Sequence, residues 1–259
     1  MTEKDIIQYI FAEEWYQQIC AFFNFDQSRD REARDYLFNL RHDFDPNILF
    51  KTISRQLNQK QPIFFGAGPN LVYQLDEIHN VLQNKRETFF LTAADGASLA
   101  LKIKNIIPDL IVTDLDGLDH DDLLDFIEQK VILLIHGHGD NIEKLKNLEQ
   151  TIRSTRNLIC TTQVDAKYPV INPGGFTDGD RSVFFCHHLA PKSQTFILLG
   201  YELRKTIGKF SKPDFKEAMP LNNKKRAKLD FCKKLLNSIS ERHHRLIQYY
   251  SPESRTFFK

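Results

Sequence analysis

The stretch PDLIVTDLDG, residues 108–117, is a run of apolar, β-forming residues that ends in two aspartates and a glycine. Its apolar part does not alternate with polar residues, and this pattern is typical of a strand buried on both faces of a parallel sheet. Ligands of open parallel sheets bind beyond the carboxyl ends of the strands. We therefore expect a strand over residues 109–113 and a polar site formed by the residues that follow it.

Five further apolar runs have the same character, and helix-like segments separate them. The apolar runs cover residues 62–65, 88–93, 131–136, 157–162 and 195–200. The segments with helical periodicity cover residues 70–85, 98–105, 121–130 and 141–154. Alternating strands and helices predict an α/β fold with a mostly parallel, Rossmann-like sheet.

Both ends of the chain lack this alternation. Residues 1–60 show only helical periodicity, so we expect a helical N-terminal subdomain there, followed by an α/β domain over residues 61–259. The basic segment from residue 224 to about residue 250 predicts an amphipathic C-terminal helix.

The composition places the chain among ordinary globular proteins. Of its 259 residues, 27% are charged and 41% are hydrophobic, which excludes disordered, collagen-like and membrane-spanning proteins. The four cysteines are scattered without a CxxC pair, which argues against a zinc ribbon or a redox pair and fits a reducing compartment. The N-terminus carries acidic residues where a signal peptide needs basic ones. We expect a cytoplasmic protein without a membrane anchor.

Charge is distributed unevenly along the chain, although the net charge is only +1. Residues 108–126 contain seven aspartates and no lysine or arginine. Residues 202–245 contain thirteen Lys and Arg against five Asp and Glu, without the interleaved aromatic motif of an RNA-binding module. An acidic and a basic segment together suit a metal ion and a polyphosphate, and nothing indicates a nucleic acid.

Two glycine-containing motifs follow the first two expected strands. In GAGPN, residues 66–70, Gly66 and Gly68 form a turn before a helix, where backbone N–H groups favour a phosphate. In AADGA, residues 93–97, Asp95 and Gly96 follow the second strand. Asp95 is a candidate for ribose hydroxyls, for a metal or for a helix N-cap, and the glycine turn also suits a purely structural role.

The third and fourth strand ends carry candidate metal ligands. If the tip after residue 113 is extended, Asp114 and Asp116 point to the same side and can bind one hard cation. HGHGDN, residues 136–141, resembles the ligand set of a zinc hydrolase, but Asn141 stands where a further histidine is expected. The oxygen-only set of Asp95, Asp114, Asp116 and Asp140 favours Mg²⁺ instead.

The last two motifs are TTQ at residues 161–163 and NPGGFTDGDR at residues 172–181. Neutral groups in the first can hydrogen-bond a heterocycle, and the acids and arginine of the second indicate a charged ligand. Together the strand ends indicate an enzyme that acts on a nucleoside triphosphate. The sequence has neither a P-loop nor the protein-kinase motifs. A methyltransferase or NAD enzyme would leave the Asp-x-Asp and HGHGDN motifs unexplained, and a non-catalytic nucleotide-binding protein would not need the aspartates.

In their order and spacing, these motifs resemble the archaeal 6-hydroxymethyl-7,8-dihydropterin diphosphokinases of the MptE type. The resemblance runs from about residue 61 to residue 235 and includes IGKFS at residues 207–211. PDLIVTDLDG is also similar to thiamine diphosphokinase, which leaves thiamine as an alternative acceptor. The resemblance implies a thiamine-diphosphokinase-like catalytic domain over residues 61–259. The implied reaction transfers diphosphate from ATP to a reduced pterin and releases AMP, in the biosynthesis of a methanopterin- or folate-type cofactor.

The implied activity suggests a role for each candidate residue. The expected catalytic residues are Asp114, Asp116, His136 and Arg181. The expected nucleotide-binding residues are Gly66, Gly68, Asp95, Gly96 and Lys209. The expected pterin-binding residues are Thr162, Gln163, Asn172, Asp178 and Asp180. The expected Mg²⁺ ligands are Asp114, Asp116 and Asp140. Whether His136 or His138 takes the acceptor proton or binds a phosphate stays open, as does a homo-oligomer formed through the N-terminal helices.

Overall fold

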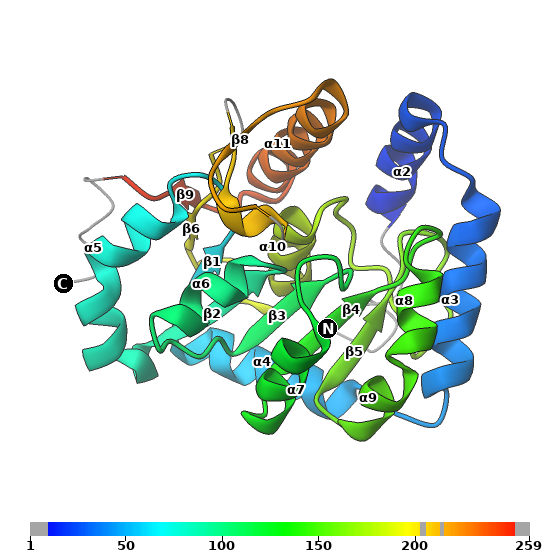
Figure 1. Cartoon of the computed structure of the whole chain (residues 1–259), viewed down its shortest axis with the longest axis horizontal. Coiled ribbons are helices and arrows are strands. Elements are labelled where there is room, and N and C mark those ends of the chain that lie inside the picture. Colours follow the sequence, from blue (N-terminus) through cyan, green and yellow to red (C-terminus); the bar gives the residue numbers. More distant parts are fainter. Residues whose placement is uncertain (1–9, 203–205, 213–214, 252–259) are drawn as a thin grey trace.

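The structure is a computed structural model that describes residues 10–202, 206–212 and 215–251. Its centre is a parallel seven-stranded sheet with the order β5-β4-β3-β2-β1-β6-β9 (Figure 1). The strands are β1 (Gln61–Phe65), β2 (Phe89–Ala94), β3 (Leu110–Thr113), β4 (Ile132–His136), β5 (Leu158–Thr161), β6 (Phe196–Leu199) and β9 (Ile247–Tyr249). A short antiparallel pair is formed by β7 (Thr206–Ile207) and β8 (Met219–Pro220).

The predicted α/β fold with a mostly parallel sheet is confirmed. The six expected strands are all present, and each of their ends lies within one residue of its expected place. The chain runs outward from β1 to β5 and then returns to place β6 beside β1, so the strand order changes direction between β1 and β6. Such a change of direction is where ligands bind in open α/β sheets.

Helices connect the strands, as the alternation predicts. They are α2 (Ile10–Phe23), α3 (Gln27–Arg41), α4 (Asn47–Gln59), α5 (Leu71–Asn84), α6 (Ala97–Ile103), α7 (His120–Glu128), α8 (Ile142–Asn147), α9 (Glu149–Ser154), α10 (Asp178–Leu189) and α11 (Asn223–His243). The segment expected as one helix over residues 141–154 is divided into α8 and α9. Two single turns, η1 (Arg86–Thr88) and η2 (Lys209–Ser211), complete the structure. None of the described helices combines the length and apolar character that a bilayer crossing requires.

The helices form a layer on each face of the sheet (Figure 1). Phe64 and Phe90 point to the face covered by α4, α10 and α11. Ile63 and Leu91 point to the opposite face, where α5 and α6 pack. Helices α3, α7, α8 and α9 extend this second layer over β3, β4 and β5. Since both faces are covered, the strands are apolar throughout, and this explains the unbroken hydrophobic runs.

The first helices belong to these same layers. Leu37 of α3 packs with the β3–β5 side of the sheet, and Ile53 of α4 packs against the opposite face; both side chains are fully buried. The domain boundary at residue 60 stays a prediction, and it falls directly before β1.

The expectation of one helix from residue 224 to about residue 250 is wrong at its end. Helix α11 stops at His243, and His244 adopts a left-handed conformation with φ of 54°. Ile247–Tyr249 then pairs with β6 as strand β9. The buried guanidinium of Arg245 stabilises the turn, because it donates hydrogen bonds to the carbonyl oxygens of Gln194 (2.9 Å) and Ala190 (3.1 Å).

Candidate active site

The carboxyl ends of the central strands open into a cavity of about 540 Å³, a size typical of small-molecule sites. Residues that directly follow β1 to β6 form its floor. The α2–α3 turn, the start of α10, residues 206–212 and the first turns of α11 contribute the walls. Of the predicted site residues, those that line the cavity are Gly66, Gly68, Asp95, Gly96, Asp114, Asp116, His136, Asp140, Gln163 and Asp178.

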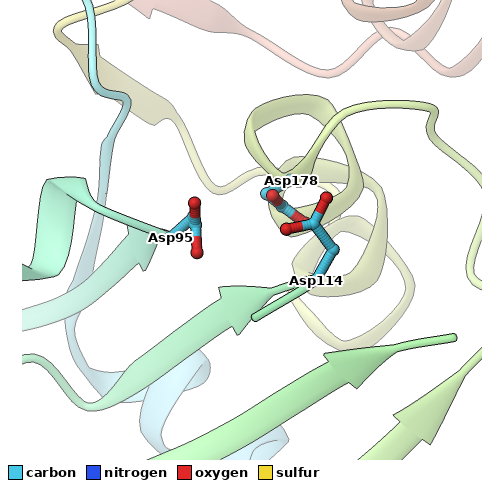
Figure 2. A group of neighbouring side chains, drawn as sticks. All are labelled: Asp95, Asp114 and Asp178. Carbon is cyan, nitrogen blue, oxygen red and sulfur yellow. The ribbon is translucent and has the colours of Figure 1, made fainter. Parts of the chain in front are cut away.

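Three carboxylates converge at the middle of this cavity, which we call the acidic group: Asp95, Asp114 and Asp178 (Figure 2). One oxygen from each lies within 4.8 Å of the others. Asp95 follows β2, Asp114 follows β3, and Asp178 is the first residue of α10. Sequence reasoning identified all three as site residues, but it did not predict that they would meet.

Hydrogen bonds hold Asp95 toward the group. Its Oδ1 accepts from the Thr113 hydroxyl (2.7 Å) and from the Gly117 N–H (3.1 Å). Burial and the neighbouring Asp114 carboxylate raise the pKa of Asp95 to about 6. Nearby positive charge would therefore stabilise the ionised form of Asp95.

The other two members differ in their surroundings. Burial alone would raise the pKa of Asp114, but the imidazole of His138, 3.5 Å from its Oδ2, helps to hold that pKa below its ordinary value. Burial, together with the charges of Asp114 and Asp95, raises the pKa of Asp178 well above its ordinary value. Three close carboxylates repel one another unless a cation lies between them.

The donor set fits a hard divalent cation. Mg²⁺ takes oxygen ligands at about 2.1 Å, so opposite ligands lie about 4.2 Å apart. The three carboxylate oxygens of the acidic group lie within 4.8 Å of one another, only slightly more than this distance of about 4.2 Å. Mg²⁺ also keeps open positions for substrate phosphates, and the cavity offers space for them.

The extended tip assumed for Asp114 and Asp116 is not formed; both residues line the cavity, but Asp116 lies outside the acidic group, and its role as a metal ligand stays a prediction. Leu115 between them has φ of +69°, so the tip is not extended and the alternation of side chains is lost. Asp116 forms ion pairs with Lys144 and, at 2.7 Å, with Lys212. Burial alone would raise the pKa of Asp116, but these two ammonium groups lower it to about 2.

Asp140, the remaining expected metal ligand, lies at the cavity rim. Its side chain is exposed, and it is outside the acidic group formed by the described residues. Asn141, which stands where a zinc site would need histidine, has a structural role. Its amide donates to the backbone oxygens of Asp114 (2.9 Å) and His136 (2.7 Å), so it ties the loops after β3 and β4 together.

Lysines on the opposite wall face the acidic group. Lys225 and Lys228 are three residues apart on α11 and line the cavity together with Lys212. Burial, more than any neighbouring charge, lowers the pKa of both α11 lysines. Within the described part of the chain, neither has a carboxylate within the 4.0 Å of an ion pair. The basic helix is evident in the sequence, but these two lysines were not predicted as site residues, although their i, i+3 spacing was a usable signal.

The glycines after β1 serve backbone packing. The N–H groups of Gly66 and Gly68 donate to the carbonyl oxygens of Leu199 and Gly200, at 2.8 Å each. These amides are thus not available for the phosphate that the sequence suggested. A Cβ at Gly68 would lie 2.3 Å from the Gly200 oxygen, so close approach to the loop after β6 explains this glycine.

A second close approach involves Gly96 and the 206–212 segment. A Cβ at Gly96 would lie 2.0 Å from the Phe210 oxygen. Lys209 is exposed, with its ammonium over the Phe210 ring at 4.9 Å, and it lies outside the cavity. Lys212, in the same segment, faces the cavity instead.

Arg181 and Asp180 lie behind the cavity wall. Arg181 is fully buried and donates to the carbonyl oxygens of Gly174 (3.3 Å) and Phe176 (3.4 Å). Asp180 accepts from the N–H groups of Phe176 (2.8 Å) and Thr177 (2.7 Å) and caps α10. Both residues shape the loop that carries Asp178.

Asn172 and Thr162 also have structural partners outside the cavity. The Asn172 amide donates to the Val164 oxygen (2.9 Å), and the Thr162 hydroxyl accepts from the Val164 N–H (3.3 Å). Of the TTQ motif, only Gln163 reaches the cavity. There it meets Asp30 of α3, to which it donates a hydrogen bond of 2.8 Å; nothing in the sequence pointed to Asp30.

Comparison with known proteins agrees with these features. A family described as 6-hydroxymethylpterin diphosphokinase, MptE-like, matches residues 35–208. A Methanocaldococcus jannaschii protein named 6-hydroxymethyl-7,8-dihydropterin pyrophosphokinase is 33% identical over 241 residues, which cover 88% of this chain and 95% of that protein. A protein of the same name from Pyrococcus furiosus is 34% identical over 86% of this chain and 92% of its own length. Another from Methanothermobacter thermautotrophicus is 31% identical over 86% of this chain and 91% of its own length.

Proposed function

The chain belongs to the MptE-like 6-hydroxymethylpterin diphosphokinase family, and from this we propose that it transfers diphosphate from ATP to 6-hydroxymethyl-7,8-dihydropterin. The products are AMP and the pterin diphosphate, an intermediate suited to making a methanopterin- or folate-type cofactor. The observation that carries the proposal is the acidic group facing Lys225 and Lys228 across one cavity. A metal-bound polyphosphate needs both kinds of charge at once. We also propose that the protein acts in the cytoplasm, where ATP is available.

The acidic group would hold Mg²⁺. When bound there, the ion supplies positive charge to the phosphate oxygens of the donor. Asp95 is prepared for this role by Thr113 and Gly117, which fix its orientation before any ligand binds. Asp114 is held by the backbone N–H of Asp116 at 3.0 Å.

The reaction forms a bond between the pterin hydroxymethyl oxygen and the β-phosphorus of ATP. The bond from that phosphorus to the oxygen bridging to the α-phosphate breaks, AMP leaves with the bridging oxygen, and the hydroxyl proton is released. Such a transfer needs in-line positioning and neutralised charge more than covalent chemistry. Lys225 and Lys228 are suited to bind the phosphate oxygens, because no carboxylate among the described residues pairs with them.

Asp116 serves as a positioning residue in this scheme. Its carboxylate bridges Lys144 and Lys212, so it orients Lys212 at the cavity wall. Burial of Asp116 would favour its neutral form, but the two lysines lower its pKa to about 2 and keep this bridge charged near neutral pH.

The test is AMP release from ATP with 6-hydroxymethyl-7,8-dihydropterin and with thiamine in parallel, each with Mg²⁺ and with excess chelator. We expect AMP only with the pterin and only with the metal. AMP with thiamine alone would keep the chemistry and replace the acceptor. Absence of AMP with every acceptor in the presence of Mg²⁺ would refute the proposal.

A further inference from the structure

The cavity is elongated because the strand ends that form its floor follow the order of the sheet. Gly66 and Gly200 lie at the end of β1 and β6, the acidic group lies at β2 and β3, and His136 and Gln163 lie at β4 and β5. Neighbouring strands are about 4.8 Å apart, so β1 and β5 are about 19 Å apart. This span suits two substrates end to end, with the transferred group above the acidic group in the middle.

His136 provides an unused hydrogen-bonding group at the β4–β5 end. The side chain is 3% exposed, and its Nδ1 lies 3.1 Å from the Thr161 hydroxyl. Its Nε2 is buried without a hydrogen-bond partner among the described residues, although the residue lines the cavity. The Gln163 carboxamide lies beside this ring and opposes the lowering of its pKa, but it makes no hydrogen bond of normal geometry to Nε2. A buried polar atom of this kind costs free energy unless a ligand satisfies it.

The electrostatics of this end favour a neutral ligand group. Burial, followed by the charges of Arg181 and His138, lowers the pKa of His136 well below its ordinary value. The imidazole is therefore neutral near pH 7 and offers a hydrogen bond rather than a charge. A neutral ring is a weak partner for a phosphate, and an imidazole with such a lowered pKa is a weak base toward an alcohol.

A network that includes the first helices fixes this end of the cavity. The buried carboxylate of Asp30 accepts from Gln163 (2.8 Å), from the Gly139 N–H (2.7 Å) and from the Tyr16 hydroxyl (2.7 Å). Because Gln163 donates its Nε2 to Asp30, its Oε1 is left as an acceptor. His136 and Gln163 thus present fixed, uncharged hydrogen-bonding groups to the cavity.

Aromatic rings line the adjacent wall. Phe25, from the α2–α3 turn, and Phe176, from the loop before α10, both face the cavity, with ring centroids 6.3 Å apart. The ammonium groups of Lys224 and Lys228 lie over these two rings, 5.9 and 5.6 Å from the centroids of Phe25 and Phe176. A planar heterocycle would therefore contact the ring surface that these lysines leave uncovered.

We infer that the acceptor heterocycle binds at the β4–β5 end, with its polar edge on His136 Nε2 and Gln163 and its ring against Phe25 or Phe176. The inference rests on the proposed function and specifies which end of the cavity serves the acceptor. It assigns His136 to recognition of the heterocycle rather than to proton transfer or phosphate binding.

The test compares His136→Ala and His136→Gln with the parent enzyme and with His42→Ala, an exposed histidine outside the cavity. We expect His136→Ala to raise the KM for the pterin about tenfold and to leave the KM for ATP within twofold. His136→Gln, which restores a polar group near the Nε2 position, recovers most of the affinity, and His42→Ala behaves as the parent. Pterin fluorescence titration without ATP checks the same loss as a dissociation constant, and thermal unfolding confirms that each variant is folded.

Each other outcome overturns the inference. A fall in kcat with both KM values unchanged would indicate proton transfer, and a rise in the KM for ATP alone would indicate phosphate binding. Unchanged kinetics in a folded His136→Ala protein would leave no role in recognition. Turnover by the parent enzyme tests the proposed function separately, so failure of the parent with the pterin is distinguishable from failure of the subsite.

Discussion

Replacing Asp30 by alanine should show how strongly the first helices support the site. Asp30 is 4% exposed and accepts three hydrogen bonds of 2.7–2.8 Å. Hydrogen bonds to a charged group contribute about 1.5–3 kcal/mol each. Part of this loss is offset because the variant no longer has to bury a carboxylate, so we expect the free energy of unfolding to fall by about 3–5 kcal/mol. For a chain of this size this corresponds to a fall in Tm of about 10 °C.

The same change should act selectively on one substrate. Without Asp30, neither Gln163 nor the Gly139 loop is held, so the KM for the pterin should rise about tenfold while the KM for ATP changes less than threefold. Asp30→Asn keeps one acceptor oxygen and should give an intermediate result. Asp43→Ala, an exposed acid after α3, serves as the matched control. A Tm within 2 °C of the parent, or equal rises in both KM values, would refute the reasoning.

Three further predictions concern the other parts of the cavity. Gly96→Ala should lower kcat/KM about 100-fold, since its Cβ would force the Phe210 oxygen back from 2.0 Å by more than 1 Å and displace Lys212. Steady-state kinetics checks this, with Ile103→Ala, an exposed position on α6, as control. Lys225→Met should raise the KM for ATP at least tenfold. Arg226→Met, at an exposed position on the same helix, should leave this KM unchanged, and equal effects of the two variants would contradict the assignment of Lys225 to the phosphates. Burial and Asp114 raise the pKa of Asp95 to about 6, so activity at low Mg²⁺ should fall as the pH drops through about 6. Saturating Mg²⁺ should move the midpoint of this pH–activity profile to lower pH. A midpoint that does not depend on Mg²⁺ would argue against Asp95 as a ligand.

The sheet could be predicted because burial on both faces leaves a plain pattern in the sequence. Residues 109–113 are apolar throughout, and the acids after them lie where parallel strands place their ligands. Strand β9 was missed because Ile247–Tyr249 is a short edge strand directly after a long helix. Its pairing with β6 depends on a left-handed residue at His244, which the pattern does not reveal.

The composition of the site was harder to predict than its location. Asp114 and Asp116 were paired by assuming an extended tip, but Leu115 has a positive φ, and Asp178 rather than Asp116 completes the acidic group. Asp178 reaches Asp114 because α10 packs against β3, a long-range contact that has no local signal. Arg181 was interpreted as a phosphate ligand from its charge, whereas its helix face is fully buried.

Because Asp30 lies in α3, the helices before β1 cannot be removed without affecting the cavity. A fragment that begins at Gln61 would keep the acidic group and the lysines of α11, yet it would lose the carboxylate that holds Gln163. It would also open the apolar cluster in which Ile53 of α4 packs together with Phe64 and Phe90. Gene truncation at the apparent boundary should therefore yield an aggregation-prone product, and a peptide of the first helices supplied separately would have to restore both solubility and the acceptor end of the cavity.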